Sequence, residues 1–216
     1  MYRRVCGVHC VSSTERQFMF GRLFGKKSPP AVPAEMIIVQ LNARLQPIHR
    51  GEFFEDPLDS ALKKRKMGEV SGGGTMQEKS GEVDYCDIEL LLPNVSQESI
   101  AFIVETLETI GAPKGSKLTV GSSKAERPFG RTEGLAVYLN GTDLSEDVYK
   151  NGDSNFVHGE FGRLLGVEGR VLSYWQGPAE TALYMYGASF ASMKSLLGPF
   201  LAAYPLCQKC RIVQVA

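Results

Sequence analysis

Alternating hydrophobic and polar positions predict β-strands along much of the chain. In residues 36–45 (MIIVQLNARL), Ile37, Val39 and Leu41 fall on one face of a strand, and their neighbours fall on the other. Successive side chains of a strand point to opposite faces, so this alternation is typical of a sheet with one buried side. In the first part of the chain, strands are predicted over residues 36–45, 69–77, 83–92 and 117–120.

Helical periodicity separates these strands. Apolar side chains spaced three or four residues apart predict a helix over residues 96–110, with Ser96 as its N-cap. A shorter helix is predicted over residues 56–68, because a proline stands in its first turn and a glycine at its end. His49 and Arg50, which come before this helix, are assigned to a loop.

The same order of elements returns in the second part of the chain. Its clearest signal is a hairpin around the turn Gly177–Glu180, whose glycine and proline favour a chain reversal between two apolar strands. The predicted elements are a strand over 135–140, a helix over 156–165, strands over 171–176 and 181–186, a helix over 189–204 and a strand over 211–215.

Each half therefore has the order β-α-β-β-α-β, and both halves resemble ferredoxin-like domains over residues 34–216. The resemblance implies an α+β fold of two tandem ferredoxin-like βαββαβ sandwiches, a duplication with antiparallel four-stranded sheets and helices on one face. We expect domains at 34–121 and 132–216, joined by a linker at 122–131. Residues 1–33 are rich in arginine and lysine and end in a proline-rich linker, so we expect a disordered tail there. The fold hosts many unrelated functions and predicts none of them.

Composition narrows the classes of function. The 216 residues carry a formal net charge of zero, whereas a nucleic-acid-binding domain usually needs a basic face. No apolar run approaches the ~18 residues of a membrane-spanning helix, and no signal-peptide pattern is evident. Five cysteines, an odd number without a secretion signal, favour reduced thiols. We therefore expect a cytoplasmic protein that binds neither nucleic acid nor membrane and carries no cofactor.

One face of the first predicted sheet gathers polar side chains. In the ferredoxin-like strand order the first and third strands are neighbours, which places two polar rows side by side. These rows are Gln40, Asn42 and Arg44 on the first strand and Tyr85, Asp87 and Glu89 on the third. Paired carboxylates near an arginine can do acid–base chemistry or bind a polar ligand. The alternative is a solvated face with ordinary cross-strand ion pairs.

The second predicted sheet has an aromatic face instead, formed by Tyr138, Tyr174, Tyr184 and Tyr186. Aromatic sheet faces stack bases in single-stranded RNA binders, but the basic, glycine-containing pattern of those proteins is missing. Packing between the two halves, or between two copies of the chain in a homodimer, is the simpler interpretation. A ligand pocket between the two sheets is the functional alternative.

Two cysteines form a C-x-x-C motif, Cys207 and Cys210. Together with Cys6, His9 and Cys10 they could supply the ligands of a tetrahedral zinc site. A redox-active C-x-x-C usually begins a helix, whereas this one follows a helix. The alternative, and the interpretation we adopt, is a pair of ordinary thiols in a loop.

Two other patterns predict no chemistry. The run Gly72–Thr75 has the composition of a phosphate-binding loop, but it lies within a predicted strand and therefore indicates a β-bulge or a flexible edge. His158 and Glu160 are two residues apart on a predicted helix, so their side chains do not face each other.

These observations favour a soluble, non-enzymatic binding or interaction protein, with a regulatory or inhibitory role toward a protein partner. The alternative is a small-ligand-binding protein or an enzyme. Its site would comprise Gln40, Asn42, Arg44, Tyr85, Asp87 and Glu89, with Tyr184 and Tyr186 facing them. Carboxylates with a raised pKa in a closed cleft would favour this alternative.

Overall fold

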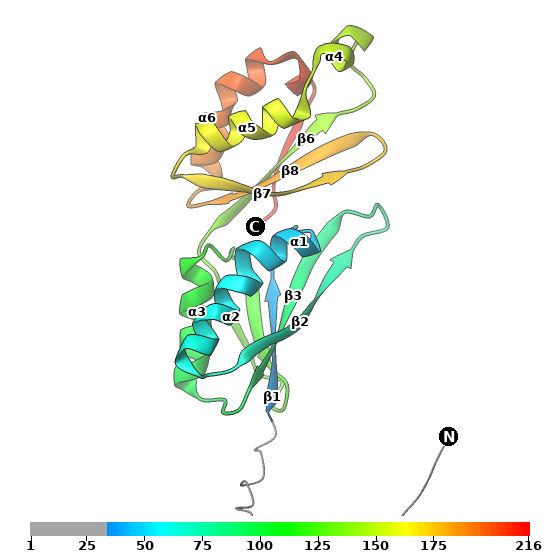
Figure 1. Ribbon diagram of the computed structural model, residues 1–216. Helices are drawn as coiled ribbons and strands as arrows, with labels where there is room; N and C mark the ends of the chain where they lie inside the picture. Colours follow the sequence, from blue (N-terminus) through cyan, green and yellow to red (C-terminus); the bar gives the residue numbers. More distant parts are fainter. Residues whose placement is uncertain (1–33) are drawn as a thin grey trace, which may run out of the picture. The chain divides into compact units, whose positions relative to one another are not determined.

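Two antiparallel sheets run through residues 34–216, the part of the chain that the computed structural model describes (Figure 1). The first sheet has the strand order β2-β3-β1-β4-β5, and the second has the order β7-β8-β6-β9. The strands of the first sheet are β1 (Glu35–Leu41), β2 (Glu69–Gln77), β3 (Val83–Leu92), β4 (Ser116–Val120) and β5 (Glu126–Phe129). Those of the second are β6 (Glu133–Asn140), β7 (Gly169–Gln176), β8 (Glu180–Gly187) and β9 (Arg211–Gln214).

The first helical segment is longer than its sequence pattern predicts. It begins at Pro47, whose fixed φ suits the first helical position, so His49 and Arg50 are helical and not in a loop. The segment consists of α1 (Pro47–Arg50), the π-helical turn η1 (Gly51–Glu55) and α2 (Asp56–Arg65). The other helices are α3 (Gln97–Thr109), α4 (Glu146–Asn151), α5 (Ser154–Leu165), α6 (Phe190–Ala203) and the short η2 (Pro205–Cys207).

The expected α+β class with two antiparallel sheets is confirmed. The two halves are nevertheless not strict copies of each other. The segment 122–131, expected to be a linker, contributes the strand β5, which pairs with β4 and adds a fifth strand to the first sheet only. The tail expected over residues 1–33 lies outside the described residues.

The helices α2 and α3 cover one face of the first sheet. Ile37, Val39 and Leu41 of β1 point toward this face and are fully buried, as their alternation predicts. Ile103 and Leu107 of α3 belong to the same core cluster. Figure 1 shows both helices on one side of the strands. The first half is therefore a two-layer sandwich with one open sheet face.

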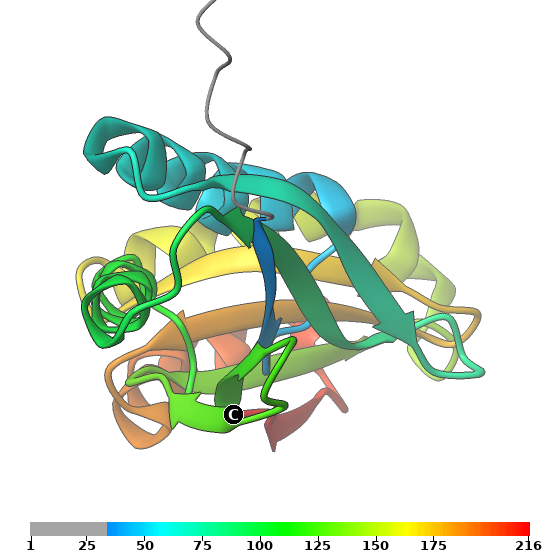
Figure 2. The ribbon, with the colours of Figure 1, turned by 90° about the horizontal axis from the view of Figure 1, so that it is seen from below.

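The second sheet is covered on both faces. One face packs against α5 and α6 through residues such as Val137, Phe161 and Leu197. The opposite face, which includes Tyr138 and Tyr184, belongs to the core cluster of the first half. Figures 1 and 2 show the second sheet lying across the end of the first half, beside α1. The halves therefore share a core. The helix-free face of the second sheet is buried against the end of the first half.

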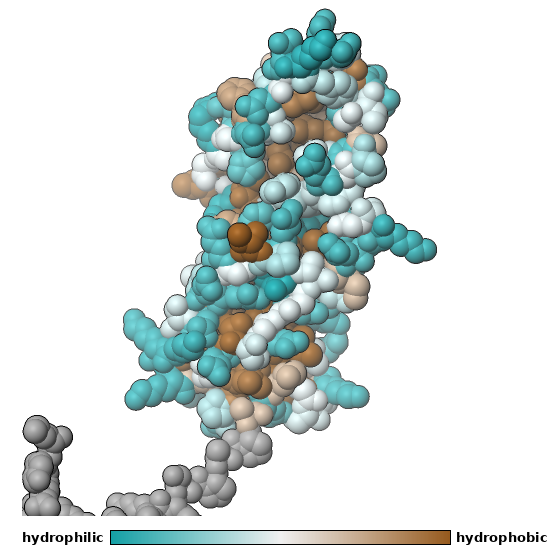
Figure 3. Space-filling model, turned by 45° about the vertical axis from the view of Figure 1, so that its right-hand side comes forward, coloured by the Kyte–Doolittle hydropathy of each residue, from teal (hydrophilic) through white to brown (hydrophobic). Residues whose placement is uncertain are grey.

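The surface in the view of Figure 3 is mostly hydrophilic, and apolar residues reach it in separate patches. Met36 and Ile38, on the open face of the first sheet, are 44% and 37% exposed. No helix within residues 34–216 has both the length and the apolarity that crossing a membrane requires.

Candidate functional site

The structure divides the predicted polar site among three places. Arg44 leaves the first sheet beyond the end of β1 and lies at the junction of the halves with Tyr184 and Tyr186. The backbone N–H of Arg44 donates to Tyr186 Oη at 2.7 Å. The guanidinium of Arg44 pairs with the carboxylate of Glu82. Three of the predicted residues are thus brought together, but around a partner that the sequence analysis did not identify.

Glu82 is the centre of this junction cluster, which comprises Arg44, Glu82, Tyr138, Tyr184 and Tyr186. Tyr184 Oη donates to Glu82 Oε1 at 2.7 Å, and the hydroxyl of Tyr138 donates to the same oxygen. Burial, together with the neighbouring carboxylate, raises the pKa of Tyr138 to about 12 and raises that of Tyr184 as well. Both hydroxyls therefore stay protonated at neutral pH, and the junction cluster fastens the halves together.

The other predicted residues do not join this cluster. Gln40 and Asp87 are direct partners on β1 and β3, where Gln40 Nε2 donates to Asp87 Oδ1 at 3.4 Å. Tyr85 and Glu89 lie on the same open face and are partly exposed. Burial raises the pKa of Asp87. This face therefore carries one carboxyl group that is harder to ionise than usual.

Asn42 has a structural role. Its backbone N–H donates to Ser116 Oγ at 3.1 Å, and its side-chain Nδ2 donates to the carbonyl of Lys114 at 2.8 Å. These bonds join the residue after β1 to the first residue of β4 and to the turn before it. The eight predicted site residues therefore belong to three separate places.

The glycine run in β2 makes room for a buried ion pair. A bulge or a flexible edge was predicted at Gly72–Thr75, and the register of β2 shifts between Val70 and Gly72, at the start of this run. A Cβ at Gly73 would lie 2.6 Å from Glu55 Oε1, the atom to which Arg50 Nε bonds at 2.6 Å. Arg50 is 7% exposed and also donates to the Gly74 carbonyl at 2.8 Å. The run therefore accommodates the Arg50 side chain and bonds to it.

The C-x-x-C cysteines lie at η2 and after it. Burial raises the pKa of Cys207 to about 12, and it raises that of Cys210 also. Both side chains are therefore thiols at neutral pH, which does not suit an activated nucleophile. Within residues 34–216 no group of three or more His, Cys, Asp or Glu side chains is placed to hold a metal ion. Cys6, His9 and Cys10 lie outside the described residues.

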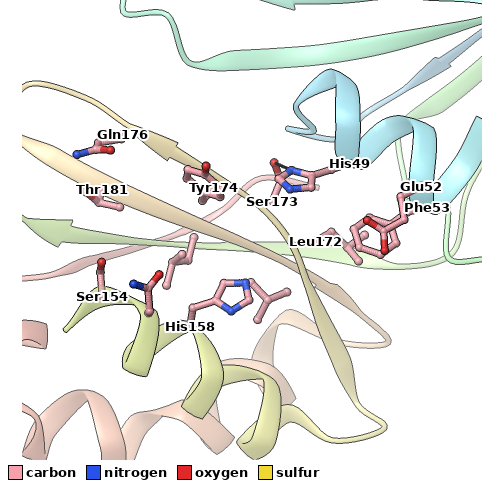
Figure 4. Close-up of a pocket in the computed structure, with 13 residues that line it drawn as sticks. His49, Glu52, Phe53, Ser154, His158, Leu172, Ser173, Tyr174, Gln176 and Thr181 are labelled. Carbon is pink, nitrogen blue, oxygen red and sulfur yellow. Dashed lines mark hydrogen bonds between the residues drawn. The ribbon is translucent and has the colours of Figure 1, made fainter.

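A cavity of about 500 Å³ lies beside β7, one of the two edge strands of the second sheet. Its walls come from both halves: His49, Glu52 and Phe53 of α1 and η1, and Ser154, Asn155 and His158 of α5. Figure 4 shows His49, Glu52 and Phe53 on one side of the strands and Ser154 and His158 on the other. Residues of β7 and β8 complete the lining, namely Val171, Leu172, Ser173, Tyr174, Gln176, Thr181 and Leu183. Its volume is within the range of small-molecule pockets.

His49 is held in one orientation by Ser173. Ser173 Oγ lies 2.9 Å from His49 Nδ1 and accepts the backbone N–H of Gln46 at 3.2 Å. Ser173 is only 2% exposed, so its hydroxyl proton needs a protein acceptor, and His49 Nδ1 is the acceptor in reach. The network therefore places the imidazole proton on Nε2. Among the described residues no hydrogen bond engages Nε2, and no buried side-chain nitrogen or oxygen lacks a partner, so Nε2 is accessible.

The surroundings of His49 keep it neutral. Burial lowers its pKa, an effect that the nearby Glu52 opposes and His158 reinforces. Its ring stacks on Phe53, with centroids 6.3 Å apart, and meets Tyr174 edge-on at 5.9 Å. His49 thus offers the cavity an uncharged N–H donor within a row of aromatic rings.

A β-bulge builds this site, and the sequence pattern does not reveal it. The register of β7 against β8 shifts between Val171 and Ser173. Leu172 packs in the core of the first half and Ser173 bonds to His49, so two consecutive side chains face the first half. In a strand without a bulge, one of these two side chains would point to the opposite face of the sheet. A proline at the start of α1 was the one available signal that His49 is helical.

The chain was compared with known proteins by sequence and by structure. No family model matches it, and no curated protein matches it. Solved structures with some likeness include the first two RRM domains of a yeast poly(U)-binding protein, at 12% identity and a TM-score of 0.23, covering 83% of this chain and 99% of that one. A putative monooxygenase of Fusobacterium nucleatum has 9% identity and a TM-score of 0.30, covering 85% and 91%. One of Lactobacillus acidophilus has 14% identity and a TM-score of 0.28, covering 85% and 95%. Such distant likenesses carry no argument about function.

Proposed function

We propose that this protein binds a small molecule in the cavity between α1–η1, β7 and α5. The observation that carries the proposal is His49, which lines an open cavity and whose orientation and protonation are set by the buried Ser173. Fixing a donor before the ligand arrives reduces the entropy lost on binding. The cytoplasmic location, the tandem repeat and the binding role belong to this same proposal.

Binding without catalysis is the better-supported role for this pair. Ser173 and His49 resemble a nucleophile with its base, but Ser173 is 2% exposed and its oxygen already accepts the N–H of Gln46. A substrate could not approach that oxygen without breaking the contact between the halves. Because Nδ1 accepts from Ser173, Nε2 carries the proton and acts as a donor, not as a base.

Binding at this cavity also has more support than chemistry at the polar face. Arg44 is engaged by Glu82 at the junction, whereas Asp87 and Glu89 lie on the open face of the first sheet. An enzyme site built from Arg44, Asp87 and Glu89 would need these three side chains in one place. A protein partner or a homodimer, expected from the sequence, stays a prediction.

The experiment is a fragment screen by saturation-transfer NMR on the full-length protein. His158 is exposed and lines the cavity, so His158→Trp should fill part of it without disturbing the core. The matched control is Arg163→Trp, an exposed position on the same helix outside the lining. We expect a set of fragments whose signals disappear with His158→Trp and persist with Arg163→Trp. The proposal would be contradicted if the saturation-transfer signals of all hits persist with both substitutions, or if the screen gives no hits.

A further inference from the structure

We infer that the ligand of this cavity is an uncharged, planar heteroaromatic molecule, such as a nucleobase, its nucleoside or a pyridine carboxamide. The inference rests on the proposed function and specifies its ligand class. Three properties of the lining lead to it: a row of aromatic rings, a set of neutral hydrogen-bonding groups, and the kinds of charge present.

The aromatic row favours a flat ligand. Phe53, His49 and Tyr174 follow one another along one wall, and the aliphatic side chains of Val171 and Leu172 lie on β7. A planar ring can stack on such a wall, and stacking on aromatic side chains tolerates many ring systems. Tyr174 is 45% exposed although it borders the cavity, so a ligand could cover aromatic surface that is now in solvent.

The polar groups suit a ring that both donates and accepts hydrogen bonds. The carboxamides of Asn155 and Gln176 each offer a donor and an acceptor, and the hydroxyls of Ser154 and Thr181 do the same. His49 adds one fixed donor. Heteroaromatic rings with ring nitrogens and exocyclic oxygen or amino groups present this mixture at their edges, whereas hydrocarbons and simple phenols do not.

The charges of the lining disfavour an anionic ligand. No lysine or arginine occurs among the described residues that line the cavity, and the one carboxylate there is Glu52. Arg170 is close by, but its guanidinium stacks on the Phe53 ring at 4.9 Å and it is not part of the lining. Phosphate and carboxylate ligands usually meet arginine or lysine. A phosphate on the ligand should therefore add no affinity.

The π-helical turn supports a ligand-binding role for this wall. Glu52 and Phe53 both project from η1, which interrupts an otherwise α-helical segment. Such turns occur frequently at functional sites because the extra residue re-aims the side chains. Here the turn directs two neighbouring side chains into one cavity.

The test measures dissociation constants for matched pairs of compounds with the full-length protein. The pairs are nicotinamide with nicotinate, nicotinamide with cyclohexanecarboxamide, and adenosine with AMP. We expect nicotinamide and adenosine to bind, nicotinate and cyclohexanecarboxamide to bind roughly tenfold more weakly than nicotinamide, and AMP to bind no more tightly than adenosine. His158→Trp should abolish this binding, and Arg163→Trp should leave it unchanged.

Two variants test the fixed donor. His49→Phe keeps an aromatic ring but removes Nε2–H, and it should weaken nicotinamide binding roughly tenfold. Ser173→Ala leaves the ring in place but frees its tautomer, so a smaller loss is expected. Near-ultraviolet circular dichroism reports whether each variant keeps its fold, and only folded variants count.

Several outcomes would overturn the inference. Tighter binding of nicotinate or AMP would indicate an anion site, and equal binding of cyclohexanecarboxamide would show that stacking contributes nothing. If screened fragments occupy the cavity by the His158→Trp criterion but no heteroaromatic compound competes with them, the ligand class is wrong while the proposed function stands. If no compound of any class is sensitive to His158→Trp, both proposals fail.

Discussion

The helix-free faces of the two sheets differ in solvent exposure. On the second sheet this face carries Tyr138, Tyr184 and Tyr186, and all three are at most 4% exposed. On the first sheet it carries Met36 and Ile38, both exposed by more than a third, beside Gln40 and Asp87. The same order of the four corresponding strands thus leads to a buried face in one half and an open face in the other.

The difference shows that a sheet face with polar groups can be buried only when those groups find hydrogen-bond partners. Each tyrosine on the second sheet brings a hydroxyl that must find a partner once water is removed. Glu82 accepts from two of them, and the third accepts the backbone N–H of Arg44. On the first sheet, Gln40, Tyr85, Asp87 and Glu89 stay partly exposed, so water can reach these polar side chains.

The largest expected effect comes from breaking the junction cluster. Arg44→Met would leave Glu82 buried without its positive partner, and we expect the free energy of unfolding to fall by about 3 kcal/mol. Urea unfolding followed by fluorescence measures this, because Trp175, the single tryptophan, packs against the shared core. The matched control is Lys117→Met, which breaks the exposed Lys117–Glu126 pair of the first sheet and should change little.

A second substitution separates charge from burial at the junction. Arg44→Met combined with Glu82→Gln removes both charges and keeps an acceptor for the tyrosine hydroxyls. We expect this double variant to recover much of the lost stability, since an uncompensated buried charge is the main cost. If the double variant is as unstable as the single one, the network depends on its geometry and not on charge balance.

An intermediate effect is expected from removing one tyrosine hydroxyl from the buried face, with the same change on the open face as its comparison. Tyr186→Phe leaves the partly buried backbone N–H of Arg44 without its acceptor at 2.7 Å and should cost about 1–3 kcal/mol of stability. Tyr85→Phe on the open face of the first sheet should stay within about 0.5 kcal/mol. Chemical denaturation of both variants gives the comparison. Equal losses would mean that the first face is covered in solution, which analytical ultracentrifugation would show as an oligomer.

The smallest effect concerns pH and the open face. Burial raises the pKa of Asp87 in the folded protein, so the folded state holds this proton more tightly than the unfolded state. Its contribution to stability is therefore present at low pH and is lost as the pH rises through the folded-state pKa. Asp87→Asn should remove this dependence and leave the variant slightly more stable than the parent at neutral pH. A series of thermal melts across the acidic range tests this, and a loss of stability at neutral pH would contradict it.

Local pattern was sufficient for most of the elements. The strands β1 and β3, the helix α3 with its Ser96 cap and the hairpin of β7 and β8 all follow from spacing along the chain. The strand β5 was not predicted, because a polar, proline-containing segment is typical of a linker. It forms a strand here by pairing with β4. The start of α1 was missed because its four residues are too few to show a period.

The candidate site was less predictable, for the same physical reason. Arg44 and the tyrosines could be selected by residue type, but Glu82 is more than 50 residues from Tyr138, and no local spacing links them. His49 and Ser173 are likewise 124 residues apart. Their pairing depends on a β-bulge and on how one sandwich end meets a sheet face, and neither leaves a regular period in the sequence.

The sequence by itself determined the α+β class, the order of most elements and the apolar side of β1 and β3, because these depend on periods of two and 3.6 residues. The tertiary structure alone decided which helix-free face is covered, where Glu82 and Arg44 meet the tyrosines, and that a cavity with two imidazoles lies beside β7. Those outcomes depend on long-range contacts between surfaces, whose free energy is gained only when both halves are folded and docked.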